Sequence, residues 1–147
     1  MEKSNRISDM AVLELERGEY TCVLTDGELI YTSKARGVKP LVRFIDEGGI
    51  PAGLYAADRV VGKATAYLYV ILKIRELYAR VISEPAVEVL RSYGISVSYG
   101  TLVRNIINRR GDGICPFEEA VLSIQDPTEA YASIRQKMNE MNIDIYE

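Results

Sequence analysis

Apolar residues occupy every face of the stretch between Val60 and Leu72, in which Lys63 is the only charged side chain. A surface helix shows one apolar stripe, whereas a helix that is apolar all round is covered on every side. The pattern therefore predicts a central helix over residues 58–73, with Asp58 as its N-cap. The stretch is too short to span a bilayer.

Two other patterns lie upstream of this stretch. Apolar residues at helical spacing predict a first helix over residues 6–17. Residues rich in β-formers at 20–24 and 28–32 flank an Asp-Gly pair, which predicts an antiparallel hairpin. The other predicted elements are a helix from Pro40 to Glu47, a connector over 50–57, a strand over 76–82, a helix capped by Ser83, a strand over 95–99, a short helix over 101–107, a helix from Pro116 to Ile124, and a last helix that starts with a capping box at 126–129.

This order of elements predicts an α/β fold. Helical crossovers between strands imply at least one parallel pairing, and the hairpin adds an antiparallel one. The sheet is therefore expected to be mixed, with helices on both faces. A chain of 147 residues fits one domain, which we expect to span residues 1–147, with a tail from about residue 142.

Composition narrows the chemistry. The net charge of −3 and the pI of about 5.2, with basic residues scattered along the chain, predict no nucleic-acid and no membrane partner. Cys22 and Cys115 are far apart and form no metal-type pair, which favours a reducing cytoplasm. Histidine, the commonest general base and metal ligand, is absent. We therefore expect no metal and no cofactor.

Two residues fit badly into the predicted central helix. Gly62 costs about 1 kcal/mol relative to Ala inside a helix, and Lys63 places a cation near the positive end of the helix dipole. With Asp58, Lys63 is a candidate anion clamp, because backbone amides at a helix start attract phosphate or carboxylate. The alternative is a lysine that extends to the surface or pairs with Glu84.

Three further candidates lie outside that helix. Cys115 precedes a helix start and follows two arginines, which favours a thiolate, although a structural free cysteine is the alternative. Glu118 is a candidate acid or base, but acids in a first turn commonly serve the helix dipole. Arg36, next to a loop glycine, is a candidate for contact with a ligand phosphate or is simply solvated.

Four strings of the sequence resemble a known family. The strings RGVKPL, DRVVGKATA, VISEPAVEVLRSYGI and INRRGDGICPFEEAV are similar to domain of unknown function 1893, a prokaryotic family placed in the cytidine-deaminase-like superfamily. The resemblance covers roughly Ile7 to Met138. It implies a three-layer α-β-α fold with the active-site position near the helix starts.

The ligands of active deaminases are not present. Active members of that superfamily carry a His-Ala-Glu or Cys-Ala-Glu string at one helix start and a Pro-Cys-x-x-Cys string at the next, which together hold zinc. The corresponding strings here are Gly62-Lys63-Ala64 and Ser83-Glu84-Pro85-Ala86. These residues cannot build the catalytic zinc site, so the resemblance does not carry deaminase activity to this chain.

We therefore expect a protein that binds a small anionic or nucleotide-like ligand at the start of the central helix. The expected ligand-binding residues are Asp58, Gly62, Lys63, Ser83, Glu84 and Arg36. One alternative is a zinc-independent enzyme that uses Cys115 or Lys63. Another is a non-catalytic module for self-association. We also expect a homo-oligomer, most simply a dimer, with residues 102–107 in the contact.

Overall fold

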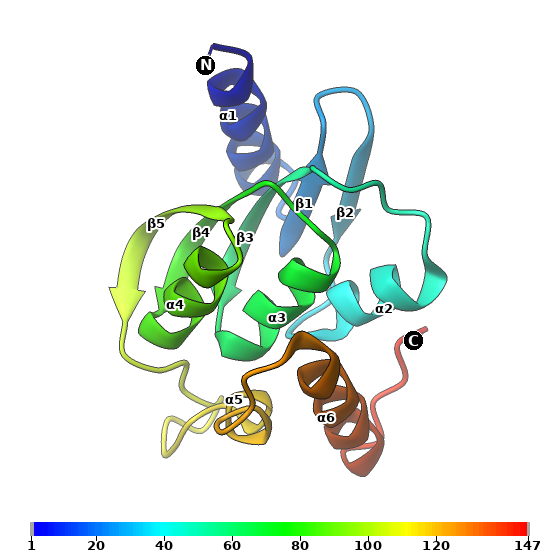
Figure 1. Ribbon diagram of the computed structural model, residues 1–147, viewed down its shortest axis with the longest axis vertical. Helices are drawn as coiled ribbons and strands as arrows, with labels where there is room; N and C mark the ends of the chain where they lie inside the picture. Colours follow the sequence, from blue (N-terminus) through cyan, green and yellow to red (C-terminus); the bar gives the residue numbers. More distant parts are fainter. Residues whose placement is uncertain (1, 147) are drawn as a thin grey trace.

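The computed structural model describes the backbone of residues 2–146 and the side chains of residues 6–146 (Figure 1). Its elements are α1 (Glu2–Arg17), β1 (Cys22–Thr25), β2 (Ile30–Ser33), α2 (Lys39–Glu47), β3 (Tyr55–Val61), α3 (Lys63–Ile71), β4 (Glu76–Ser83), α4 (Glu84–Ser92), β5 (Ser96–Val103), α5 (Pro116–Ala120) and α6 (Pro127–Glu140). Among these helices, none is both long and apolar enough to cross a membrane.

The five strands form one mixed sheet in the order β2-β1-β3-β4-β5. Strand β1 is antiparallel to both of its neighbours, whereas β3, β4 and β5 are parallel. Each parallel step is connected by a helix, α3 or α4, because a parallel pair needs a long crossover. The predicted mixed sheet is confirmed.

Helices cover both faces of the sheet, as predicted. Helix α1 lies on one face, where Ala11 and Leu15 pack with Val23 and Ala57 of the strands. Helices α2, α3 and α4 lie on the opposite face (Figure 1). The larger core forms on that second face, around α3.

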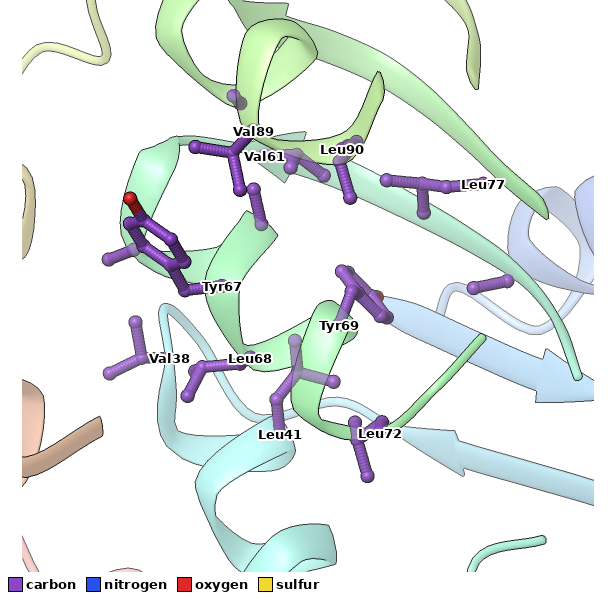
Figure 2. Close-up of a cluster of buried hydrophobic side chains, with 14 of the residues drawn as sticks. Val38, Leu41, Val61, Tyr67, Leu68, Tyr69, Leu72, Leu77, Val89 and Leu90 are labelled. Atoms are coloured by element: carbon purple, nitrogen blue, oxygen red, sulfur yellow. The ribbon is translucent and has the colours of Figure 1, made fainter. Parts of the chain in front are cut away.

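Helix α3 is the covered central helix that the apolar pattern predicts. All residues from Ala64 to Tyr69 are buried. Figure 2 shows their side chains pointing in several directions, toward Leu41 of α2 on one side and Val89 and Leu90 of α4 on another. Helix α6 covers a further side.

The predicted start of this helix is wrong. The helix begins at Lys63 with Gly62 as its N-cap, and the preceding residues 55–61 form the central strand β3 rather than a connector and a first helical turn. Asp58 is therefore a strand residue and not an N-cap. A parallel strand buried on both faces shows no alternation of polar and apolar residues, so its apolar run merges with that of the helix.

The predicted short helix over residues 101–107 is also wrong. Strand β5 continues to Val103, and residues 104–115 form a loop that is closed by an isolated bridge between Ile107 and Ile114. Leu102 and Ile107 are 42% and 54% exposed. Their part in a contact between copies of the chain stays a prediction.

Two predicted helix caps are confirmed. The Ser83 hydroxyl accepts a hydrogen bond from the Ala86 amide, and the Asp126 carboxylate accepts one from the Glu129 amide. Both helices have proline at their first or second position, where its missing N–H costs nothing. Helix α5 is shorter than predicted and ends at Ala120.

Candidate functional site

A cavity of about 400 Å³ opens where β3 passes into α3. Several segments that are far apart in the sequence meet there: the start of β1, the loop before α2, the end of β3, the start of α3, the loop after β5 and helix α5. The lining residues are Thr21, Cys22, Arg36, Gly37, Val38, Pro40, Asp58, Arg59, Val60, Gly62, Ala64, Thr65, Ile106, Arg109, Cys115, Phe117 and Glu118.

Asp58 is the buried acid of this cavity. It is only 8% exposed and lies on β3 opposite Cys22 of β1. One carboxylate oxygen, Oδ2, accepts a hydrogen bond from the Tyr69 hydroxyl at 2.6 Å. The other, Oδ1, accepts a bond from the Val60 amide at 3.2 Å. The carboxylate is thus held in place by α3 and by its own strand.

Burial raises the pKa values of Asp58 and of its neighbours Cys22 and Tyr69. It raises the pKa of Asp58 from 3.8 to about 7, and the hydrogen bonds from the Tyr69 hydroxyl and from the Val60 and Arg59 amides oppose the rise only in part. Burial, followed by the nearby Asp58 charge, also raises the pKa of the Cys22 thiol well above its ordinary value. The pKa of Tyr69 is raised for the same reasons. Cys22 and Tyr69 are therefore neutral near pH 7, where Asp58 changes its charge.

Glu118 of α5 occupies the start of helix α3. Its two carboxylate oxygens accept hydrogen bonds from the amides of Lys63, at 2.7 Å, and Ala64, at 2.9 Å. Burial raises the pKa of this carboxyl, and these two bonds with the nearby Lys63 charge lower it in part. The expectation that these amides are available to an external anion is therefore wrong, because an acid of the same chain already binds them.

The glycine at the helix start is explained by this contact. A Cβ added to Gly62 would lie 2.4 Å from the carboxyl carbon of Glu118. The backbone of Gly62 is extended, with φ of −102°, so the glycine is required for space and not for an unusual conformation.

Lys63 does not line the cavity. Its ammonium group donates a hydrogen bond to the Leu122 carbonyl at 3.0 Å and lies 5.9 Å from the centre of the Tyr67 ring. The Tyr67 hydroxyl in turn donates to the Ile124 carbonyl at 2.9 Å. Lys63 therefore extends away from the cavity, in keeping with the alternative of a lysine that reaches the surface. These bonds, together with those of Glu118, hold the segment after α5 against α3.

Three arginines line the cavity. Arg36 and Arg109 are exposed, whereas Arg59 is half-buried, and its Nε donates to the Tyr20 carbonyl. The sequence points to Arg36 as a ligand contact, whereas Arg109 is one of the two arginines that precede Cys115 and Arg59 carries no signal. No local pattern shows that a strand arginine and two loop arginines converge in space.

Cys115 lies in the same cavity and is half-buried. The loop before it is a tight turn in which the Asn108 side chain accepts a hydrogen bond from the Gly111 amide. The Cys115 amide donates to the Ile106 carbonyl at 2.9 Å. This turn brings Ile106, Arg109 and Cys115 to the cavity together.

The start of α4 is not part of the site. Ser83 is fully buried as a helix cap, and neither it nor Glu84 lines the cavity. The loop before α2 lines the cavity instead. Among the described residues, no group of three or more Cys, Asp or Glu side chains gathers as a metal site.

Comparison with known proteins gives a family. No curated protein matches the chain. The crystal structure of a DUF1893 family protein (TM1506) from Thermotoga maritima is similar, with 30% sequence identity and a TM-score of 0.82 over 92% of this chain and 90% of the other. The family model described as a domain of unknown function (DUF1893) matches residues 10–138. The chain therefore belongs to the DUF1893 family.

Proposed function

We propose that this protein binds a small anionic or nucleotide-like ligand in the cavity between the starts of α2 and α3. The observation that supports this most is the convergence of Arg36, Arg59 and Arg109 on one cavity of about 400 Å³. Cavities of roughly 300–1,000 Å³ with a few convergent polar groups are typical of small-molecule sites. Arginine is the side chain best suited to phosphate and carboxylate.

The arginine side chains, and not the amides of α3, supply the positive charge. Glu118 already occupies the amides of Lys63 and Ala64, and the Lys63 ammonium group is bonded to Leu122. An anion that enters the cavity therefore meets the guanidinium groups of Arg36 and Arg109, which are exposed and available to it.

We further propose that the fold belongs to the cytidine-deaminase-like superfamily without its zinc. The three layers and the mixed sheet support the fold assignment, and the absence of histidine from the sequence supports the lack of zinc. Elemental analysis of the dialysed protein is expected to find no stoichiometric zinc, and one zinc per chain would overturn the proposal.

A zinc-independent enzyme is the second candidate. Cys115 and Asp58 line the same cavity, so a nucleophile and a group that titrates near pH 7 share one site. Lys63 is not part of this candidate because its ammonium group lies outside the cavity.

A thermal-shift screen tests ligand binding. The panel contains phosphate, nucleosides, nucleotides and sugar phosphates, and a ligand at about a hundred times its Kd adds about 2.7 kcal/mol to the free energy of unfolding. We expect a stabiliser of the wild type that stabilises the double variant Arg36→Ala/Arg109→Ala much less at subsaturating concentration.

Two controls make the screen specific. Arg110→Ala removes the neighbouring exposed arginine, which does not line the cavity, and should respond like the wild type. Lys63→Ala should also respond like the wild type. A panel without any stabiliser, or equal responses of the double variant and Arg110→Ala, would contradict the proposed function.

A further inference from the structure

The cavity has an acidic inner end and a basic outer end. Asp58, at the inner end, is 8% exposed. Arg36 and Arg109, on two different loops, are exposed at the outer end. Side chains of opposite charge therefore lie at different depths of the cavity.

Asp58 can accept further hydrogen bonds. A carboxylate offers about four acceptor positions. The Tyr69 hydroxyl and the Val60 amide use one on each oxygen, and the Arg59 amide is a further donor to the group. Within residues 6–146, no lysine or arginine forms an ion pair with Asp58. The carboxylate is therefore held in place, lines the cavity and keeps acceptor capacity for a donor of a ligand.

Much of the remaining cavity lining is apolar. Val38 and Pro40 of the α2 start and Phe117 of α5 are buried there, and Ile106 is half-buried. Such a lining suits the carbon body of a ligand.

We infer that the ligand carries two groups: an N–H donor that bonds Asp58 at the inner end, and an anionic group that meets Arg36 and Arg109 at the outer end. This inference rests on the proposed function and adds the second half of the ligand and its orientation. The donor is either a heterocyclic or exocyclic N–H or an ammonium group, since each of them can donate to a carboxylate.

Two matched pairs of probes test the inference by titration calorimetry. Adenosine 5′-monophosphate is compared with purine riboside 5′-monophosphate, which lacks the amino group. Phosphoethanolamine is compared with ethyl phosphate, which lacks the ammonium group. In at least one pair, the wild type should bind the donor-bearing member about tenfold more tightly, as one charge-assisted hydrogen bond allows. The pair that shows the preference identifies the donor.

Two variants separate the ends of the ligand. Asp58→Asn replaces one acceptor oxygen with a donor and should reduce the preference to about twofold or less. Arg36→Ala/Arg109→Ala should weaken both members of a pair equally and keep the preference. Arg110→Ala should behave like the wild type in both respects.

A pH series on the wild type also tests the role of Asp58, and it needs no variant that could fail to fold. The preference should be larger at pH 8.5 than at pH 5.5, because protonation of Asp58 removes the charged acceptor. Cys22 and Tyr69, which face Asp58, stay neutral in this range, and Glu118 is the other acid of the cavity. Glu118→Gln should therefore keep the pH effect.

The outcomes distinguish the two proposals. If both members of each pair bind equally to the wild type, or if the preference survives in Asp58→Asn, the proposed donor contact with Asp58 is wrong and the anion site stands. If none of the four probes binds and the wider panel stabilises nothing, both proposals are wrong.

Discussion

Glu118 and Gly62 form a matched contact between α5 and α3, 56 positions apart in the chain. The carboxylate of Glu118 caps the helix that starts beside Gly62, and the missing side chain of Gly62 gives it the space to do so. Glycine and acid thus depend on each other, and the contact fixes the wall of the cavity on the α5 side.

Gly62→Ala should therefore destabilise the protein by displacing Glu118. The side chain of Glu118 is flexible and can move away, so the cost is the lost helix cap, about 1–2 kcal/mol in the free energy of unfolding. Urea denaturation measures it. In the background of Glu118→Ala the same glycine substitution should be nearly neutral, because the clash and the cap are both gone. Additive effects of the two substitutions would show that the contact does not explain the glycine.

The stability of the protein should depend on pH through Asp58. Its pKa is raised from 3.8 to about 7, so between these values the folded state binds more protons than the unfolded chain. The contribution of this group to the free energy of unfolding is greatest below pH 4, falls by about 1.4 kcal/mol per pH unit as pH rises toward 7, and is constant above.

Asp58→Asn isolates this contribution. The variant should gain stability relative to the wild type as pH rises from 5 to 8, by an amount on the order of 2–3 kcal/mol. Urea denaturation at pH 5, 6, 7 and 8 provides the comparison. Asp9→Asn, which removes an exposed carboxylate of α1, should run parallel to the wild type. Parallel curves for Asp58→Asn as well would mean that Asp58 is ionised in the folded protein throughout.

The two cysteines should differ in reactivity. Cys22 is 1% exposed, whereas Cys115 is half-buried in the cavity wall. Iodoacetamide at pH 7.5 is therefore expected to label Cys115 at least about tenfold faster, since access and thiolate content govern the rate. Peptide mass spectrometry measures both rates, and Cys115→Ser should lose the fast reaction. A saturating stabiliser from the thermal-shift panel should slow the labelling of Cys115. Unchanged labelling in its presence would place the ligand elsewhere.

The sequence predicts the layers of this fold better than its central strand. The hairpin, the helix over residues 40–47 and the helix caps at Ser83 and Asp126 carry strong local signals, and all are present. Strand β3 carries no such signal, because burial on both faces removes the alternation that identifies a strand. Its misassignment made Asp58 a helix cap, whereas the structure shows a buried strand acid that lines the cavity.

The site is predictable only in part for a related reason. Gly62 is a local misfit in the sequence. Its explanation is the carboxylate of Glu118, an acid 56 positions away, which leaves no space for a side chain at Gly62. Arg59 and Arg109 reach the cavity, and Tyr69 reaches its buried acid Asp58, through tertiary packing that leaves no pattern in the sequence. Lys63, also a local misfit, turns out to bond the carbonyl of Leu122 outside the cavity.

The central claim is that an anionic ligand binds in the cavity between α2 and α3. Amide NMR spectra of the uniformly ¹⁵N-labelled protein, recorded during titration with the strongest stabiliser of the panel, test it most directly. We expect the largest shifts at Gly37, Val60, Gly62 and Phe117, which line the cavity, and much smaller shifts in Arg36→Ala/Arg109→Ala. A separate cavity is lined by Asp46 of α2, by Arg135 of α6 and by residues 142–146. Shifts that cluster around that cavity instead, or no shifts at saturating ligand, would contradict the claim.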